Sequence, residues 1–350
     1  MKPESIREQL VPIPIDTLWG QDLEITDQDL TLTIDRFGER YVEPAVQTIA
    51  NAIDGDLLDL YVNVFSVVGT PGTPPTSLTT FTAAGVKLNN LATPPGMRSA
   101  VVNPDTEAAL LGFVNNTFNP AKTIGDQYLS GKMGVAVGQK FSMDQNVSRQ
   151  TIGVVTASVP TVNATANQSG NQILTTGWAL STAILNIGDV VQFVGVNMVN
   201  PISYRDQGKL ADFVITAPVV SDGGGLATLP IAPDLNNDAG SPFQTVVNLP
   251  AANTPIKVYS QATGAAMNAI SGVSTAQNLV FHRDAFCLAV VKQELPGGME
   301  WSEFASSQKS GYFIRLVRGY SILDNKKYTR FDVLGGKKCI RPELACRVCA

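Results

Sequence analysis

The sequence predicts an α+β chain in which an all-β domain is inserted into a mixed helix-and-strand domain, and three observations lead to this prediction. The first is an amphipathic helix pattern that runs from Ile34 to Val68. The second is an alternation of helix and strand patterns over residues 70–150, which resumes after residue 261. The third is residues 151–260, which contain nine charged residues and short β-type runs separated by turn signals.

The helix pattern is the longest periodic signal in the chain. Its apolar residues recur every three or four positions, which places them on one stripe of a helix. They are Val42, Val46, Ile49, Ile53, Leu57, Leu60, Val64 and Val68. Pro44 suits the first turn and Gly69 the C-terminal end. We therefore expect a helix from Pro44 to Val68, preceded by a short turn capped by Asp35.

Residues 1–33 show a strand pattern instead. PIPIDTLWGQDLEI and DLTLTI alternate apolar and polar residues, and Pro12 and Pro14 exclude a helix. No neighbouring run offers a partner strand, so we expect a ribbon that is unpaired locally and marginally stable by itself.

The segments that flank the all-β stretch combine helices and strands. Before it, the patterns predict helices at 77–91, 105–114 and 122–129, and strands at 97–103 and 134–147. After it, NLVFHRDAFCLAVV predicts a pair of apolar strands, and residues 312–334 predict a hairpin that turns at Asp324–Lys327. Residues 151–260 predict a small antiparallel barrel or sandwich.

Charge is distributed unevenly along the chain. Residues 1–60 hold 13 acidic and 4 basic residues, a net charge of −9, whereas residues 281–350 hold 7 acidic and 12 basic residues, a net charge of +5. Two ends of opposite net charge favour ion pairs within the chain or head-to-tail contacts between copies. The bases do not accompany a nucleic-acid-binding motif.

Membrane and enzyme functions receive little support. No apolar run reaches the length of a membrane span, and the N-terminus lacks the apolar region of a signal peptide, so we expect a soluble protein made in a cytoplasm. The sequence contains no nucleophile elbow, zinc-protease motif or phosphate loop. His282 is expected to be a structural hydrogen-bonder rather than a general base. Cys346 and Cys349 are expected to be thiols on a terminal strand, with a metal or redox site as the alternative. We therefore expect no enzyme activity, cofactor or bound metal.

Several runs resemble one family in the same order along nearly the whole chain. They are DLEITDQDLTLTIDRFGERYVEPAVQTIANAIDGDLLDLY with VGTPGTPP, MRSAVVNPDTEAAL, GDVVQFVGVNMVNP, NLVFHRDAFCLAVVKQELPGG and KKCIRPELACRV. These runs are similar to the coat proteins of tailed bacteriophages of the P22 type.

The resemblance implies the HK-97-like (Johnson) capsid fold, with a peripheral domain, an axial domain, an extended loop and an inserted β-barrel. On this sequence it implies a remnant of the extended loop and a peripheral strand at 1–33, and the spine helix at 34–69. The axial domain would be formed by 70–150 and 261–350, the latter also supplying returning peripheral strands, and the inserted barrel by 151–260. Family members usually begin with an N-terminal arm and the ascending strand of the loop. This chain resembles them from the descending strand onward, so we expect that first strand to be missing.

The function implied by the resemblance is that of a major capsid subunit, which self-assembles into the icosahedral head and encloses the genome. The implied partners are copies of the chain in pentamers and hexamers, a scaffolding protein and a portal protein, with double-stranded DNA met only at the shell interior and no membrane. The implied location is the virion shell, assembled in the host bacterial cytoplasm.

Candidate inter-subunit contacts are charged residues of the loop, of the C-terminal segment and of two polar loops in the insert. We expect the acids of the loop to meet bases on an adjacent copy. The candidates are Asp22, Glu24, Asp27, Asp29, Arg205, Asp206, Lys209, Asp234, Asp238, Arg315, Arg318, Lys337 and Lys338.

Two other functions remain open from the residues alone. One is a secreted or virion-attached β-rich binding module. The other is a carbohydrate-active enzyme on the all-β stretch, because pairs of carboxylates are plentiful, although Trp19, Trp178 and Trp301 are scattered.

Overall fold

The computed structural model describes residues 10–26, 41–117, 133–154, 159–239, 241, 243–259, 272–306, 312–323 and 326–350. The chain divides into two compact units. Unit 1 comprises Met1–Leu57 and Phe286–Ile340, and unit 2 comprises Leu58–Ala285 and Arg341–Ala350. Each unit combines helix with sheet, in agreement with the predicted α+β class. None of the helices in the described ranges combines the length and the apolar character needed to cross a lipid bilayer.

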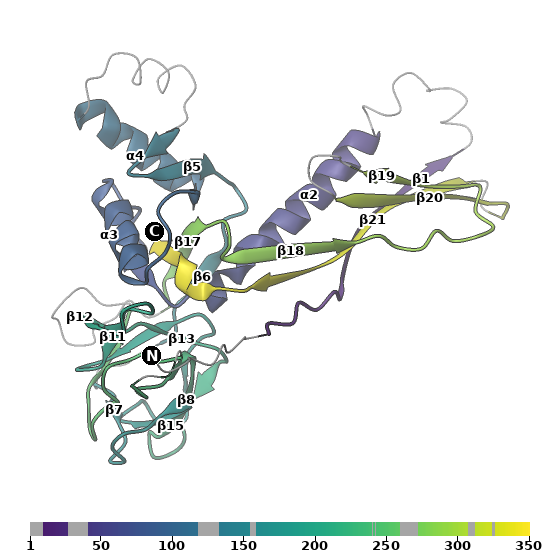
Figure 1. Ribbon diagram of the computed structural model, residues 1–350. Helices are drawn as coiled ribbons and strands as arrows, with labels where there is room; N and C mark the ends of the chain where they lie inside the picture. The colour runs from purple at the N-terminus through teal and green to yellow at the C-terminus, as the bar shows by residue number, and fades with distance from the viewer. Residues whose placement is uncertain are drawn as a thin grey trace, which may run out of the picture. The chain divides into compact units, whose positions relative to one another are not determined.

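Unit 1 contains one antiparallel sheet with β21 at its centre (Figure 1). β1 pairs with one edge of β21, β20 and β18 pair with successive parts of the other edge, and β19 extends the sheet beyond β20. The elements of unit 1 are β1 (Thr17–Thr26), α2 (Glu43–Leu58), β18 (Phe286–Val291), β19 (Trp301–Ser306), β20 (Phe313–Ser321) and β21 (Lys326–Cys339).

Helix α2 packs on one face of this sheet. Ala45 and Ile49 of the helix form a buried cluster with Trp19, Phe331 and Val333 of the strands. The four-residue spacing of the two helix residues places them on the same side. The amphipathic pattern in the sequence therefore corresponds to the stripe that packs on the sheet.

The predicted helix is wrong beyond Leu58. The chain continues as a 3₁₀-helix, η2 (Asp59–Asn63), and then as strand β2 (Val67–Gly69), which pairs in parallel with β22. Residues 64–68 are all buried, and all but Ser66 are apolar, as in a strand covered on both faces. Its β-branched residues favour a strand, and the helical spacing of Leu60, Val64 and Val68 is coincidental.

The expectation of an unpaired N-terminal ribbon is also wrong. β1 pairs with β21 from Thr17 opposite Gly335 to Thr26 opposite Lys326. The partner lies about 300 residues further along the chain, so no local pattern in the sequence indicates it. The run DLTLTI falls outside the described residues.

Unit 2 contains a seven-stranded mixed sheet with the order β2-β22-β17-β3-β5-β4, in which β6 also pairs with β17. The pairs β2–β22 and β3–β5 are parallel, and the others are antiparallel. The strands not yet given are β3 (Arg98–Val102), β4 (Val135–Ala136), β5 (Gln139–Met143), β6 (Arg149–Thr151), β17 (Ser274–His282) and β22 (Ala345–Cys349).

The two strands predicted in NLVFHRDAFCLAVV form, but they do not pair with each other. β17 pairs with β3, β6 and β22 of unit 2, whereas β18 pairs with β21 of unit 1. The chain passes from one unit to the other between Ala285 and Phe286. The sequence shows two apolar strands but contains no signal for this change of partner. The predicted hairpin is confirmed as β20 and β21, with Ser321 opposite Lys326.

Two helices pack on one face of the seven-stranded sheet: α3 (Thr79–Asn90) and α4 (Pro104–Thr117). Phe81 and Leu88 of α3 and Leu110 of α4 form a buried cluster with Val280 and Val348 of the strands. At the start of α4, Asn103 Oδ1 accepts a hydrogen bond from the backbone N–H of Thr106 at 3.2 Å. The predicted helices 77–91 and 105–114 are thus confirmed, and 122–129 lies outside the described residues.

Residues 159–259, where described, contain strands as their only regular elements. Six strands form an antiparallel sheet with the order β16-β10-β13-β15-β8-β7, and β11–β12 and β9–β14 form two further pairs. The strands are β7 (Thr161–Val162), β8 (Gly170–Thr176), β9 (Ala183–Leu185), β10 (Val190–Phe193), β11 (Asn197–Val199), β12 (Asp206–Leu210), β13 (Phe213–Ile215), β14 (Val219–Val220), β15 (Ala227–Leu235) and β16 (Ile256–Val258). We call this region the β block.

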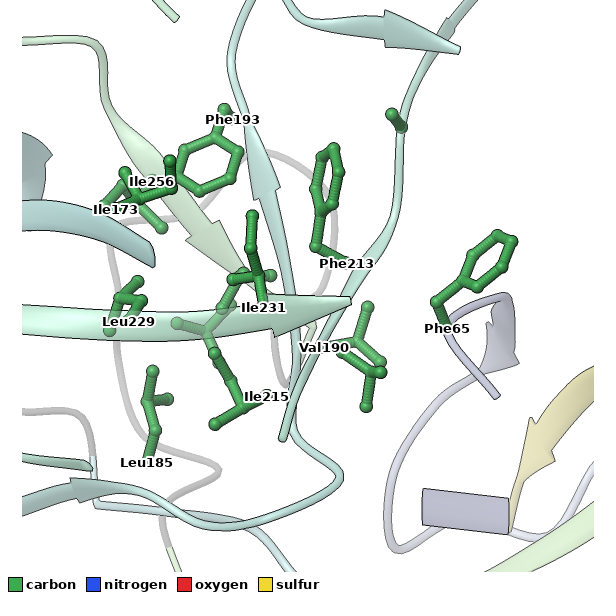
Figure 2. Packing of buried hydrophobic residues seen from close by; sticks show 14 of the residues in the cluster. Phe65, Ile173, Leu185, Val190, Phe193, Phe213, Ile215, Leu229, Ile231 and Ile256 are labelled. Carbon is green, nitrogen blue, oxygen red and sulfur yellow. The ribbon is translucent and has the colours of Figure 1, made fainter. Parts of the chain in front are cut away.

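The core of the β block is built from aliphatic and aromatic side chains of its strands (Figure 2). The rings of Phe193 and Phe213 lie 5.5 Å apart at 55°, beside Ile231 and Ile256. Phe65, which precedes β2, belongs to the same cluster, as do Val67, Leu91 and Cys349. The β block therefore shares its core with the seven-stranded sheet.

Strand β22 contributes to two cores. Cys346 and Val348 belong to the cluster with α3 and α4, whereas Cys349 belongs to the cluster of the β block. Successive side chains of a strand point to opposite faces, which explains the division. Arg347 is on the same face as Cys349 and is fully buried there.

Candidate functional site

The predicted contact residues of β1 have partners within the chain. Asp22 lies 3.7 Å from Arg330, and Glu24 pairs with Lys326. All four side chains are at least one-third exposed, so each pair contributes about 0–1 kcal/mol. Asp27 and Asp29 lie outside the described residues.

Arg315 is held by a carboxylate of the neighbouring strand. Its Nε and Nη2 donate to Asp332 Oδ1 and Oδ2 at 2.9 and 2.6 Å, and Arg330 Nε donates to Oδ2 at 3.1 Å. The hydrogen bonds with Asp332 raise the pKa of Arg315 above its usual value. Because the Asp332 side chain is 0 % exposed, removing the Arg315 guanidinium would leave this buried charge with Arg330 as its remaining cation.

Lys337 is paired with α2. Its Nζ lies 2.7 Å from Asp56 Oδ1, and Trp19 Nε1 donates to Asp56 Oδ2 at 2.6 Å. Partial burial raises the pKa of Asp56, but the hydrogen bonds from Lys337 and Trp19 together outweigh it, so that the pKa is lowered. This three-residue contact fastens the helix to the sheet within unit 1.

Arg318 and Lys338 differ from the other two predicted bases. In the described ranges neither has a carboxylate within ion-pair distance, although the guanidinium of Arg318 lies 5.9 Å from the ring of Trp301. Of the four predicted bases, these two therefore lack a carboxylate partner within the described residues, and both are half-exposed.

The predicted polar loops of the β block are partly strand. Asp206 and Lys209 lie in β12, which pairs with β11, and Asp234 lies in β15, so the expectation of plain loops at 203–209 and 234–240 is wrong at these positions. Asp206 and Lys209 lie in a strand because β12 pairs with Asn197–Val199, which the polar sequence does not predict. The charged side chains of both segments are exposed: Arg205, Asp206, Lys209, Asp234 and Asp238.

His282 has the structural role that the sequence predicts. It is buried, and its Nδ1 accepts the backbone N–H of Asp284 at 3.3 Å. Cys346 and Cys349 lie on β22 with their side chains in different cores, and burial raises the pKa of Cys346 to about 12. Among the described residues no group of three or more metal-ligating side chains occurs.

Charged residues buried between the β block and the seven-stranded sheet form a junction that the sequence did not reveal. Lys87 of α3 pairs with Asp212 of the β block and also donates to Val67 O at 2.8 Å. Gln192 Nε2 donates to Asp212 Oδ1 at 2.6 Å. The carboxylate is 1 % exposed, so it depends on these two partners.

The second half of the junction is a chain of three side chains. Arg347 Nη1 donates to Gln150 Oε1 at 3.0 Å, and Gln150 Nε2 donates to Asp189 Oδ1 at 2.7 Å. Asp189 Oδ2 accepts the backbone N–H groups of Gly153 and Asn186 at 3.0 and 2.8 Å. Burial outweighs these hydrogen bonds and raises the pKa of Asp189 to about 6.

One signal in the sequence could have indicated the junction. Asp189 and Asp212 are among the nine charges of a segment otherwise poor in charge, and Arg347 stands inside the apolar run ACRVC. An isolated charge within an apolar strand is rarely buried without a partner. The sequence does not identify which of these charges meet.

A family model gives the chain its classification. The model described as "P22 coat protein - gene protein 5" matches residues 24–347. The chain belongs to the P22 coat protein family. It is a major capsid protein of a tailed phage, a structural protein whose place is the virion shell formed by copies of itself. The predicted resemblance is thereby confirmed.

Solved structures similar to this coat protein come from other phages. A chain of Mycobacterium phage Che8 is 11 % identical with a TM-score of 0.45, over 99 % of this chain and 76 % of that one. A chain from the capsid structure of the Cyanophage P-SCSP1u is 10 % identical with a TM-score of 0.43, and the match covers 99 % of this chain and 79 % of that chain. The CUS-3 coat protein I-domain is 24 % identical with a TM-score of 0.20, and the match covers 32 % of this chain and 99 % of that chain. No curated protein sequence gives a significant match.

Proposed function

We propose that the chain builds an icosahedral phage head by assembling into rings of five and six and encloses the genome without catalysing a reaction. The observation that carries the proposal is the family model, which spans residues 24–347 and therefore both units. Identical copies can close into such rings only through contacts in which two different surfaces of the subunit meet. A scaffolding protein and a portal protein would guide assembly in the host cytoplasm, and double-stranded DNA would meet only the inner surface.

The fold assigned to this subunit is HK-97-like (Johnson). In this assignment unit 1 is the peripheral domain with α2 as a shortened spine helix, β1 belongs to the extended loop, and the seven-stranded sheet with α3 and α4 is the axial domain. Support comes from α2 on a long antiparallel sheet and from two helices on a mixed sheet.

The β block is the inserted barrel in this proposal. Its two edge strands, β7 and β16, lie at opposite ends of the six-strand order. A bridge between Thr161 and Pro255 and the hydrogen bond from Val162 N to Thr254 O, at 2.8 Å, link the two edges. These links support closure of the sheet on itself, which removes exposed edges.

Contacts between subunits are proposed to pair the acids of β1 with free bases of an adjacent copy. Arg315 and Lys337 are engaged within unit 1, so Arg318 and Lys338 are the stronger candidates among the four predicted bases. Asp22 and Glu24 are held only by exposed ion pairs, which exchange at little cost. The exposed charges of the β block are second candidates.

Charge reversal tests this proposal. The double variant Asp22→Lys/Glu24→Lys and the double variant Arg318→Glu/Lys338→Glu should each assemble at least about tenfold more slowly, and the quadruple variant should recover. Assembly is followed by light scattering and electron microscopy, with the melting temperature of the free subunit measured in parallel.

Lys337→Glu serves as the matched control, because this lysine already pairs with Asp56. It should lower the melting temperature of the free subunit before it affects assembly. Unchanged assembly in both double variants would overturn the pairing. A wild-type chain that stays monomeric with or without a scaffolding partner would overturn the assembly function itself.

A further inference from the structure

The hairpin of β4 and β5 lies at one edge of the seven-stranded sheet in unit 2. β4 ends the strand order and pairs only with β5 in the described sheet, with Ala136 opposite Gln139. Ala136 packs against the buried cluster of α3 and α4. Val135 and Val137, by contrast, are 75 % and 45 % exposed, so these two valines contribute little to that core.

The turn of this hairpin consists of Val137 and Gly138. Both residues have a positive φ, 52° and 73°. Two-residue hairpin turns with this backbone favour Asn-Gly, because asparagine tolerates the left-handed conformation, whereas the branched Cβ of valine makes it an outlier there. Val137 is therefore a strained residue whose side chain remains largely in solvent. A polar residue at this position would stabilise the free subunit.

Folding alone does not explain this hairpin. Exposed valines that occur singly are normal on a protein surface. Here two of them lie on one short hairpin, and one of the two is held in a strained conformation. Strain that the fold does not need is typical of positions that serve a function. The function that exposed apolar side chains serve best is contact with another protein surface.

A second copy of the chain is the occupant that this surface fits. Two side chains present far less area than the roughly 1,200 Å² or more that a stable interface between two separate proteins buries. In a shell built from this chain, the same small contact recurs on every copy and adds to the other contacts of that copy. Residues 133–139 carry no charge, so copies with a net charge of −5 each can approach here without placing like charges together.

We propose that the β4–β5 hairpin is a contact between copies of the chain in the shell, in which Val135 and Val137 pack on an apolar surface of a neighbouring copy. This inference rests on the proposed assembly into rings. Val137 lowers the stability of the free subunit and contributes apolar surface to a contact that forms only on assembly.

The variant Val137→Asn tests the proposal, because it supplies the residue that the turn prefers and removes the apolar side chain. The melting temperature of the free subunit should rise by about 2–4 °C. Assembly, followed by light scattering, should slow at least about fivefold, because each copy loses apolar contact area. Val135→Thr should also slow assembly but leave the melting temperature nearly unchanged, since threonine keeps the branched shape that suits a strand.

Two variants of the β block serve as matched controls. Val220→Thr on β14 removes an apolar methyl group from a valine that is 65 % exposed, and it should assemble like the wild type. Ser181→Asn places asparagine at an exposed residue with a φ of 50°. It should raise the melting temperature without slowing assembly, which separates relief of strain from loss of the contact.

A structure of assembled wild-type shells answers the question directly. Both valines should lie within about 4.5 Å of apolar atoms of a neighbouring copy. The contact would be overturned by shells in which the valines face solvent or another protein, or by unchanged assembly of Val137→Asn. A lower melting temperature of that variant would show that the turn itself requires valine and would remove the argument from strain. A wild-type chain that forms no shells would overturn the proposed function, and the contact with it.

Discussion

Asp189 is the residue whose ionisation bears most directly on the junction in unit 2. Its carboxylate accepts three N–H groups and is linked to Arg347 through Gln150, yet burial raises its pKa to about 6. A carboxyl group with a raised pKa binds its proton more tightly in the folded chain than in the unfolded chain. Stability therefore rises as the pH falls through 6 towards the unfolded value near 4.

The variant Asp189→Asn should remove this pH dependence. In the wild type, the free energy of unfolding should increase by about 1–1.5 kcal/mol between pH 7.5 and 5 from this group. The variant should show a flatter profile and a lower stability throughout, because an amide nitrogen cannot accept the N–H groups now bound to the carboxylate. Urea unfolding at several pH values measures both. The exposed Asp206→Asn should keep the wild-type slope, and parallel profiles for wild type and Asp189→Asn would contradict the assignment.

The ion pair of Lys87 with the buried Asp212 should be essential to the stability of the junction. Replacing Lys87→Met leaves the buried carboxylate of Asp212 without its cation and should cost about 3–5 kcal/mol. The double variant with Asp212→Leu should recover part of the loss, because the unpaired charge is then gone. Thermal melting measures the effect. The exposed Lys257→Met should be neutral, and an equal loss there would show that charge alone, not the buried pair, matters.

At the scale of elements, β21 shows how a strand is fitted to its neighbours. Its Gly335 and Gly336 lie where the segment before β1 crosses, and a Cβ on Gly336 would overlap the carbonyl oxygen of Pro14. A Cβ on Gly335 would lie 2.6 Å from Ala289 O. The glycine pair thus permits two backbones to approach β21 closely.

Gly336→Ala should lower the stability of unit 1 by about 1–3 kcal/mol, because the segment at Pro14 must move away. Gly319→Ala on β20 is the matched control, since its Cβ would meet Met299 Sδ at an ordinary 3.6 Å. Melting temperature and limited proteolysis at residues 10–16 measure the difference. Equal behaviour of the two variants would show that the segment does not depend on the glycine.

The elements that the sequence predicted well are those with local signals. Asn103 and Pro104 indicate the start of α4, and the run of Val, Thr and Gly after Arg149 indicates the β block. The end of α2 was mispredicted because Leu60, Val64 and Val68 satisfy a helical period, although the chain pairs as a strand from Val67. Partners far apart in the chain, such as β1 with β21 or Lys87 with Asp212, have no local signal at all.

For the whole molecule, the charge asymmetry gains a more specific meaning. Part of the acidic N-terminal charge and of the basic C-terminal charge is already paired inside unit 1, as Asp56 with Lys337 and Glu24 with Lys326 show. Membership of the coat protein family indicates a second use for these charges, in contacts between copies of the chain. The sequence shows the asymmetry and the resemblance to the family, but not which charges pair within the chain and which are left for contacts between copies.

Assembly should accordingly be sensitive to salt. Raising sodium chloride from about 0.05 to about 0.5 M should slow assembly severalfold, because exposed charges are screened beyond a few ångströms. The melting temperature of the free subunit should change little, since its main ion pairs are partly or fully buried. Light scattering at fixed protein concentration measures the rate. A rate that rises with salt would assign assembly to apolar contacts instead.

The position of β22 also has a consequence for the timing of synthesis. β2 pairs only with β22 in the described sheet, and β22 also supplies Cys349 to the β block and Arg347 to the junction. Residues 345–349 leave the ribosome after all the other described strands. A nascent chain can therefore collapse the β block early, but it cannot close the sheet until translation has passed this strand, and chaperones have that interval in which to act.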